Sequence, residues 1–266
     1  METGKIALCA IGRMENAYAV EFVEYYRSIG FDHIFIYDNN HSGEEYFEEV
    51  LSSYIEDGFV SVIAWRDKER VQLAAYSDCY ARWGKEYAWM AFYDFDEYLT
   101  IVDGSDIHTF MARYADYDCL LINWMNYTDG DMVRNDGRPM IERFTVPMPY
   151  DKRIAFDFPE NNHIKSMVRG GLDECVFMSN PHLPSTPLRC CNTRHNACGQ
   201  KPWQPYDHSV AYLKHFTTKT IEEWLSNKWA KGAAGWTYAR FVELYKDYFF
   251  KINNRTEAKE AFIREW

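Results

Sequence analysis

The segment WMAFYDFDEYL, residues 89–99, places three carboxylates, Asp94, Asp96 and Glu97, directly after an apolar run. Carboxylates this close together repel one another, and burial is costly unless a cation compensates them or they face solvent. Two aspartates separated by one residue can share a hard divalent cation through oxygen. The pattern therefore indicates a site for Mg²⁺ or Mn²⁺, and the alternative is a solvated acidic turn.

The elements that must position these carboxylates alternate regularly along the first hundred residues. Apolar runs predict strands, helical spacing of apolar residues predicts helices, and glycines mark the ends. The expected strands are 5–11, 33–38, 59–65 and 87–94, and the expected helices are 16–30, 43–58 and 70–84. This order predicts a parallel sheet covered on both faces, whose ligands bind beyond the carboxyl ends of the strands.

Beyond residue 104 the alternation becomes weaker. We expect strands at 118–124 and 140–146, and the interval 147–210, rich in Pro, Asn, Gly and His, is interpreted as loops around a site. A helix is expected from 217 onward, beginning at a threonine cap. The domain expected is 1–216, with a nucleotide-binding half (1–104) and an acceptor half (105–216), followed by a helical extension (217–266) packed on it.

Composition limits the class of protein. With 266 residues, 47% of them hydrophobic and a net charge of −11, the chain can bury a large core but repels nucleic acid and anionic lipid. Its apolar runs are too short to span a membrane, and its first residues lack a secretory pattern. The seven cysteines are interpreted as free thiols. We expect a cytoplasmic protein, with peripheral contact to the inner face of the membrane left open.

Four blocks in the same order resemble the GT-A-fold glycosyltransferases of the family 2-like and family 92-like group. The blocks are 15–40, 87–99, 161–171 and 213–232. The resemblance implies a GT-A (Rossmann-like) α/β fold, with a mostly parallel sheet flanked by helices, a loop-rich acceptor region and a helical C-terminal tail. It also implies a nucleotide-sugar donor, often linked to UDP, Mn²⁺ or Mg²⁺ as cofactor, and inverting transfer to a saccharide or lipid-linked saccharide in surface polysaccharide or glycan synthesis. A homodimer stays open.

The resemblance assigns Asp94 and Asp96 to the D-x-D motif of these enzymes. The expected metal residues are Asp94, Asp96 and His215: Asp96 would bind the metal directly, Asp94 would contact the ribose or a metal-bound water, and His215 would complete the metal site. The residues expected around the donor are Arg13, Glu15, Asp38, Asn40, Gln72, Asp78, Asp94 and Lys165. The alternatives are a turn aspartate at Asp38, a solvated helical face at 72–78 and a structural histidine at His215.

Chemistry also needs a base that removes the proton of the acceptor hydroxyl. By analogy with the corresponding loop of these enzymes we expect Asp131, then Asp129, with Glu142 and Asp173 in reserve. The sequence departs here from the small, glycine-rich loop common in family 92-like members. Sugar-stacking aromatics are expected at Trp124 and Tyr127, and cations facing the diphosphate at His163, Lys165 and Arg169, although buried aromatics and loop charges are the simpler interpretation.

Two further clusters leave alternatives open. A structural zinc site could use His182, Cys190, Cys191, His195 and Cys198, although paired C-x-x-C knuckles are missing. The aromatic tail, which could touch a bilayer or pack on the domain, comprises Trp224, Trp229, Trp236, Tyr238, Phe241, Tyr245, Phe249 and Phe250. The competing functions are a metal-dependent nucleotidyltransferase or phosphohydrolase and a non-catalytic sugar-binding module.

Overall fold

The structure, a computed structural model, describes residues 4–149, 159–229 and 248–266. Its strands are β1 (Ile6–Gly12), β2 (His33–Asp38), β3 (Val60–Ala64), β4 (Trp89–Phe92), β5 (Glu97–Ile101), β6 (Cys119–Asn126), β7 (Ile164–Arg169), β8 (Cys190–Asn192), β9 (Ala197–Cys198) and β10 (Ala211–His215). Its helices are α1 (Asn16–Ser28), α2 (Phe47–Glu56), α3 (Gln72–Trp83), α4 (Ile107–Met111), α5 (Met140–Arg143), α6 (Ile221–Glu223) and α8 (Glu257–Glu265).

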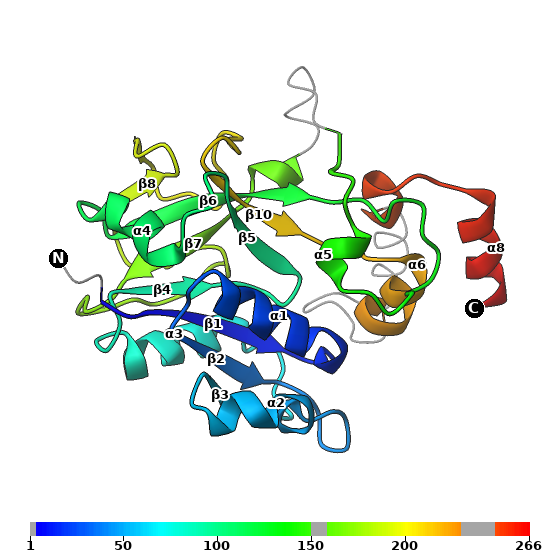
Figure 1. Cartoon of the computed structure of the whole chain (residues 1–266), viewed down its shortest axis with the longest axis horizontal. Helices are drawn as coiled ribbons and strands as arrows, with labels where there is room; N and C mark the ends of the chain where they lie inside the picture. Colours follow the sequence, from blue (N-terminus) through cyan, green and yellow to red (C-terminus); the bar gives the residue numbers. More distant parts are fainter. Residues whose placement is uncertain (1–3, 150–158, 230–247) are drawn as a thin grey trace.

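The main sheet has the strand order β3-β2-β1-β4-β7-β6-β10-β5 (Figure 1). Strands β1 to β4 are parallel, which confirms the predicted alternation of strands and helices. The sheet as a whole is mixed, because β7 runs antiparallel to both β4 and β6, and β5 runs antiparallel to β10. The predicted α/β class is confirmed, and the second half of the sheet adds strands that run both ways.

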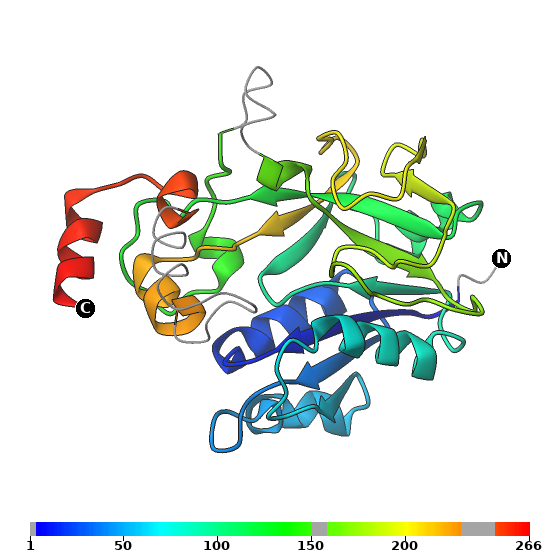
Figure 2. The same ribbon diagram turned by 180° about the vertical axis from the view of Figure 1, so that it is seen from behind.

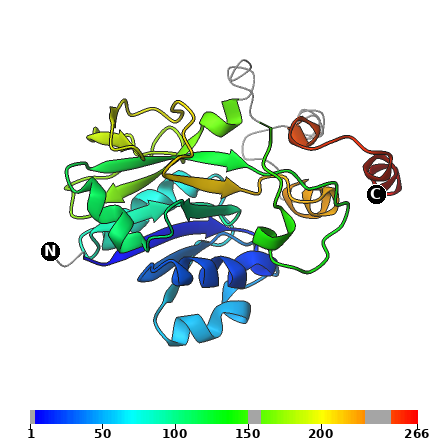
Figure 3. The ribbon, with the colours of Figure 1, turned by 45° about the horizontal axis from the view of Figure 1, so that its top comes forward.

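Both faces of the parallel strands are covered, as expected. In β1, Ile6 and Leu8 join the core with α1 and α2, whereas Ala7 and Cys9 join the core with α3. This alternation is the period of two that a strand imposes on its side chains. Figure 2, which shows the molecule from behind, brings α3 to the front, and Figure 3 shows α1 on the other side of the sheet.

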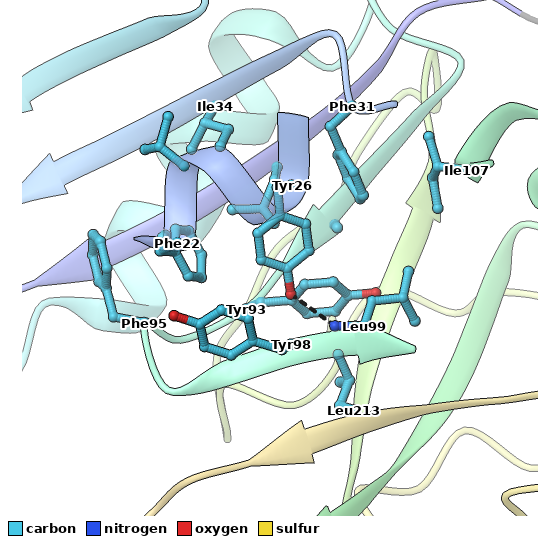
Figure 4. Packing of buried hydrophobic residues seen from close by; sticks show 14 of the residues in the cluster. Phe22, Tyr26, Phe31, Ile34, Tyr93, Phe95, Tyr98, Leu99, Ile107 and Leu213 are labelled. Atoms are coloured by element: carbon cyan, nitrogen blue, oxygen red, sulfur yellow. Dashed lines mark hydrogen bonds between the residues drawn. The ribbon is translucent and has the colours of Figure 1, made fainter. Parts of the chain in front are cut away.

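The core beneath β5 fixes the strand that follows the acidic turn (Figure 4). The hydroxyl of Tyr26 in α1 donates to the carbonyl oxygen of Glu97 at 2.7 Å and accepts from the amide of Leu99 at 3.2 Å. Phe22 packs against Tyr26 and Phe95, with ring centroids 4.8 and 4.7 Å apart. Because these partners are buried, the start of β5 is held rigidly beside the carboxylates.

The strand predicted at 140–146 is wrong, because the segment forms the short helix α5. Pro139, with φ −54°, precedes the helix, and its conformation suits a helix start. The Arg143 side chain is buried, and its two terminal nitrogens each donate to Glu223 at 2.9 Å. The apolar residues Met140 and Phe144 of the segment are buried in the core, and the ion pair of Arg143 with Glu223 anchors the helix.

The region predicted as loops, 147–210, contains strands as well. Strands β7, β8 and β9 lie within it, and residues 150–158 are outside the described part. The period of β7 is hard to recognise in the sequence because the strand has a buried lysine, Lys165, among its apolar residues. The unusual charge within this strand belongs to the site.

The helix start predicted from 217 onward is confirmed at Thr220, which caps α6. Thr220 accepts from the amide of Glu223, and Glu223 accepts in return, forming a capping box. Of the aromatic tail, Trp224 and Phe249 pack together with ring centroids 5.8 Å apart. Its members Trp236, Tyr238, Phe241 and Tyr245, and the side chain of Trp229, lie outside the described residues.

Among the described residues, no helix is long and apolar enough to cross a membrane.

Candidate active site

The acidic turn joins β4 to β5 at the carboxyl end of the parallel strands. The amide of Glu97 donates to the carbonyl oxygen of Asp94 at 3.0 Å, and the amide of Asp94 donates to the Glu97 carboxylate at 2.9 Å. These two bonds close the turn on itself. The carboxylates therefore have fixed positions before any ligand binds.

A buried lysine compensates this turn. The Nζ atom of Lys165 lies 2.8 Å from Asp94 Oδ2 and 3.6 Å from Glu97 Oε2, and the lysine side chain is fully buried. Burial by itself would lower the pKa of Lys165, but attraction to Asp94 and Glu97 outweighs this effect and leaves the pKa raised. The lysine is charged, and it supplies part of the positive charge that the acidic sequence pattern requires.

Glu97 is the most deeply buried carboxylate of the turn. Burial raises its pKa well above the ordinary value, and repulsion from Asp94 and Asp96 adds to the effect, while Lys165 opposes it. Glu97 therefore takes up a proton more readily than an exposed glutamate does. The nearby Lys165 ammonium offsets part of the repulsion among the three carboxylates.

Asp94 is also held from α3. Its Oδ1 atom accepts from Gln72 Nε2 at 2.7 Å and from the Tyr76 hydroxyl at 2.9 Å. The structure thus places Gln72, which was predicted to lie around the nucleotide-sugar donor, beside the motif. Tyr76, which sequence reasoning missed, lies there as well. Asp78 lies elsewhere, about 9 Å further along the helix than Gln72 at 1.5 Å per residue, where it accepts from the Tyr37 hydroxyl at 2.6 Å.

Asp96 has a different neighbour. His215 ends β10, where it pairs with Glu97 of β5, and its Nε2 atom lies 3.7 Å from Asp96 Oδ1. Both residues are buried. The amide of Phe216 donates to the carbonyl oxygen of Asp96 at 2.9 Å, which locks the two segments together. The sheet register therefore joins two of the predicted metal ligands.

The residues present fit a metal that takes few protein ligands. A carboxylate and an imidazole suit Mn²⁺, and Mg²⁺ commonly uses one or two carboxylates with water and phosphate oxygens. Asp94 already accepts hydrogen bonds from three donors, so it suits contact with a metal-bound water rather than with the metal itself. Within the described ranges, no group of three or more His, Cys, Asp or Glu side chains is arranged to hold a metal ion.

Asp38 and Asn40, predicted to contact the donor, form a buried network at the end of β2. Asp38 Oδ1 accepts from the amide and the Nδ2 atom of Asn40 at 3.0 and 2.7 Å. Asp38 Oδ2 contacts Arg66, whose guanidinium lies 3.5 Å from the centre of the Tyr46 ring. Arg66 was missed by sequence reasoning, although its position just after a strand was a usable signal.

Arg13 and Glu15, also predicted around the donor, each pair with a residue of opposite charge. Arg13 donates to both carboxylate oxygens of Glu44, at 3.0 and 2.7 Å, and this contact lowers the pKa of Glu44 to about 2. The Nζ atom of Lys219 lies 3.8 Å from Glu15 and 4.1 Å from the centre of the Tyr18 ring. Both cations are committed to carboxylates of the chain.

The two predicted bases lie on the loop after β6, where α8 holds them. The buried Nζ atom of Lys259 lies 2.7 Å from Asp129 Oδ2 and 3.3 Å from Asp131 Oδ1. Asp129 is buried, and burial raises its pKa despite the ion pair with Lys259. Asp131, whose side chain is 54% exposed, has a left-handed backbone with φ 64°. Of the two, Asp131 is the one accessible to a substrate.

The remaining candidates are separated by the fold. Arg169 pairs with Trp89 at the amino end of β4, so the expectation that it faces the diphosphate is wrong, because β7 runs antiparallel to β4. Asp173 follows it and is exposed. Tyr127 is buried against Phe216, with ring centroids 5.5 Å apart, and belongs to the core. Glu142 lies on α5 and lines a groove with α1.

The cysteine and histidine cluster is dispersed. Cys190 and Cys198 are register partners in the pair β8 and β9, and all seven cysteines are free. His195 packs on Tyr117, whereas His182 packs on Trp124. The histidines thus face different neighbours, and the described part of the chain contains no zinc-like ligand group here.

Comparison with known proteins gives one family match. The sequence profile of glycosyltransferase family 92 matches residues 6–235. No curated protein matches significantly.

Solved structures similar to this chain include three of S. aureus TarS 1-349. The structure whose name mentions no ligand is 12% identical to this chain and has a TM-score of 0.43. The match covers 91% of this chain and 69% of the TarS chain. The complex with UDP is 13% identical, with coverages of 92% and 70% and a TM-score of 0.43. The complex with UDP-GlcNAc is 12% identical, with coverages of 94% and 73% and a TM-score of 0.41.

Proposed function

Because this chain belongs to glycosyltransferase family 92, an enzyme family of GT-A fold, we propose that it transfers a sugar from a nucleotide-diphosphate donor, a UDP-sugar, to a saccharide hydroxyl. The family membership sets aside the non-catalytic sugar-binding module. Among enzymes it favours sugar transfer over nucleotide transfer or phosphate hydrolysis. The single observation that carries the proposal is the contrast at the acidic turn, where Asp94 is neutralised by Lys165 while Asp96 faces His215.

We propose that Asp96 and His215 hold Mn²⁺ or Mg²⁺. When bound, such a metal stabilises the charge of a diphosphate leaving group. Asp94, fixed by Gln72, Tyr76 and Lys165, orients the donor beside the metal site. This geometry requires no rearrangement of the turn, since the hydrogen bonds around Asp94 already exist in the chain itself.

We also propose that Asp131 removes the proton from the acceptor hydroxyl in an inverting reaction. The loop that carries Asp131 leaves the sheet at Asn126, the register partner of His215, so it starts beside the metal site. The exposed carboxylate of Asp131 is available to a substrate, and the Nζ atom of Lys259 lies 3.3 Å from its Oδ1 atom. Asp129 serves as the buried anchor of this loop.

The experiment is a screen of nucleotide sugars for release of nucleoside diphosphate, with Mn²⁺, with Mg²⁺ and with a chelator. Turnover of a UDP-sugar that stops with chelator and in Asp96→Asn is the expected result. Asp116→Asn, which changes an exposed carboxylate outside the site, is the matched control and should keep full activity. Release of phosphate, or nucleotide transfer without a sugar product, would favour the alternative enzymes.

A further inference from the structure

A row of rings crosses neighbouring strands next to the acidic turn. Trp124 of β6 lies over His215, with ring centroids 4.1 Å apart. On its other side Trp124 stacks on His163, with ring centroids 5.2 Å apart and planes at 27°, and its amide donates to the His163 carbonyl at 2.9 Å. His163 pairs in turn with Trp203 in an antiparallel bridge. We name His215, Trp124, His163 and Trp203 the aromatic strip.

The bridge places Trp203 on the same side of the sheet as His163. The amide of Ile164 donates to Pro202 at 3.2 Å, and the amide of Gln204 donates to Asn162 at 2.8 Å. Hydrogen bonds flanking a pair in this way mark a non-hydrogen-bonded antiparallel pair, whose side chains project from one face and approach closely. The backbone of the exposed Trp203 is therefore fixed on both sides.

Exposure increases along the aromatic strip from the site outward. His215 is 5% exposed, Trp124 and His163 are partly buried, and Trp203 is 58% exposed. An indole held in solvent on a fixed backbone loses little conformational freedom when a ligand covers it. The Nε1 atom of Trp124 is buried without a hydrogen-bond partner in the described part of the chain, which is rare for such a donor.

The strip suits a neutral ligand with apolar faces and hydroxyl edges. His182, which packs on Trp124 and His163 at 5.2 Å from each, has its pKa lowered to about 3, mainly by burial, so it stays uncharged. Aromatic faces stack on the C–H face of a sugar ring, and Trp203 at the outer end of the strip presents such a ring to solvent. A nucleic acid is disfavoured by the net charge of −11.

We propose that the aromatic strip binds the acceptor saccharide, with the receiving sugar at the His215 end and further sugars reaching Trp203. This rests on the proposed function of the site. Three strand spacings of ~4.8 Å separate the two ends, about 14 Å in all. The acceptor is therefore an oligosaccharide chain, since a single sugar ring would leave Trp203 uncovered.

The test compares Trp203→Ala with Trp266→Ala, a control of the same residue type that is 64% exposed and lies outside the strip. The probe is a printed array of neutral tri- to hexasaccharides, read without donor. Wild type and Trp266→Ala should bind, and Trp203→Ala should lose binding while Trp203→Phe keeps it. With the best-bound saccharide as acceptor, Trp203→Ala should raise the acceptor KM about tenfold or more and leave kcat and the donor KM unchanged.

The proposal is overturned if wild type binds no saccharide of the array, or if Trp203→Ala binds as wild type does. Failure of the proposed function has a separate readout. In that case UDP with Mn²⁺ would not raise the melting temperature of wild type and no nucleotide sugar would turn over. Array binding needs no donor, so it decides the role of the strip in either case.

Discussion

Asp94 and Asp96 have the same chemistry but different environments. Asp94 accepts hydrogen bonds from Gln72, Tyr76 and Lys165, whereas Asp96 lies beside His215. The spacing of the motif and the family resemblance identified Asp94, Asp96 and His215 as neighbours. The compensation by Lys165 could not be derived, because it depends on which strand follows β4 in the sheet, a contact between residues 71 positions apart.

Lys165→Met should destabilise the protein strongly. The substitution removes a buried ammonium and leaves the carboxylates of Asp94 and Glu97 without their partner. Breaking one side of a buried ion pair costs roughly 3–5 kcal/mol, and urea unfolding measures it. The control is Lys201→Met at an exposed position, where a change within about 0.5 kcal/mol is expected. Equal unfolding free energies for the two variants would show that Lys165 does not carry this role.

Glu44 should give the protein a stabilisation that depends on pH. Its pKa is lowered from 4.5 to about 2 by the hydrogen bond from Arg13. A lowered folded-state pKa stabilises the fold above the ordinary value, and this contribution is lost as pH falls from 4.5 towards 2. Because the side chain is partly exposed, solvent screening keeps the contribution below about 1 kcal/mol.

Urea unfolding of wild type and Glu44→Gln at a series of pH values tests this contribution. The excess stability of wild type should be present at pH 6 and shrink steadily below pH 4.5. Glu56→Gln, at an exposed carboxylate that ends α2, serves as the control. A difference between wild type and Glu44→Gln that stays constant across this range would contradict the assignment.

At the scale of elements, the parallel half of the sheet was predictable, whereas in the other half β6 was predicted, at 118–124, but β5, β7 and β10 were not. Strands β1, β2 and β4 are almost entirely buried, so they are continuous apolar runs between glycine-marked helices. β7 and β10 contain Lys165, Lys214 and His215, which hide their period. These two strands deliver side chains to the site, so function explains why their pattern is broken.

Gly170→Ala should disrupt the junction between β7 and the start of β4. A Cβ atom at Gly170 would lie 1.7 Å from the carbonyl oxygen of Tyr87 and 2.6 Å from that of Gly84. Because both are backbone atoms of the connection between α3 and β4, that connection and the end of β7 must separate, and a loss on the order of 4 kcal/mol or more is expected. Thermal and urea unfolding measure it.

The adjacent Gly171 provides the matched control. It has φ +73°, and no atom lies within 4 Å of the point that a Cβ atom would occupy, so Gly171→Ala should cost only about 1–2 kcal/mol of backbone strain. If Gly170→Ala were as stable as Gly171→Ala, the close approach of Gly170 to the connection between α3 and β4 would be wrong.

Helix α8 positions the loop after β6. Lys259→Met removes the ion pair with Asp129 and the contact with Asp131, so both stability and transfer kcat should fall. The expected loss of unfolding free energy is roughly 3–5 kcal/mol. Arg264→Met, at an exposed position of the same helix, should leave both unchanged. An unchanged kcat in a folded Lys259→Met variant would show that α8 does not contribute to the reaction.

For the whole molecule, the charge balance supports the proposed role of a metal. The net charge is −11, and three cations of the described residues are each paired with a carboxylate of the chain. Lys165 lies beside Asp94, Arg13 beside Glu44, and Lys219 beside Glu15. A diphosphate therefore meets little uncompensated positive charge from these residues, and a divalent cation at Asp96 and His215 would supply what they lack.

The proposed metal at Asp96 is tested most directly by calorimetric titration of UDP into three samples. These are the metal-free protein, the protein with Mn²⁺, and Asp96→Asn with Mn²⁺. UDP should bind wild type with Mn²⁺, and either removing the metal or substituting Asp96 should raise Kd about tenfold or more, a free-energy change of ~1.4 kcal/mol. Equal UDP affinity under all three conditions would contradict a metal held by Asp96 at the end of the parallel strands.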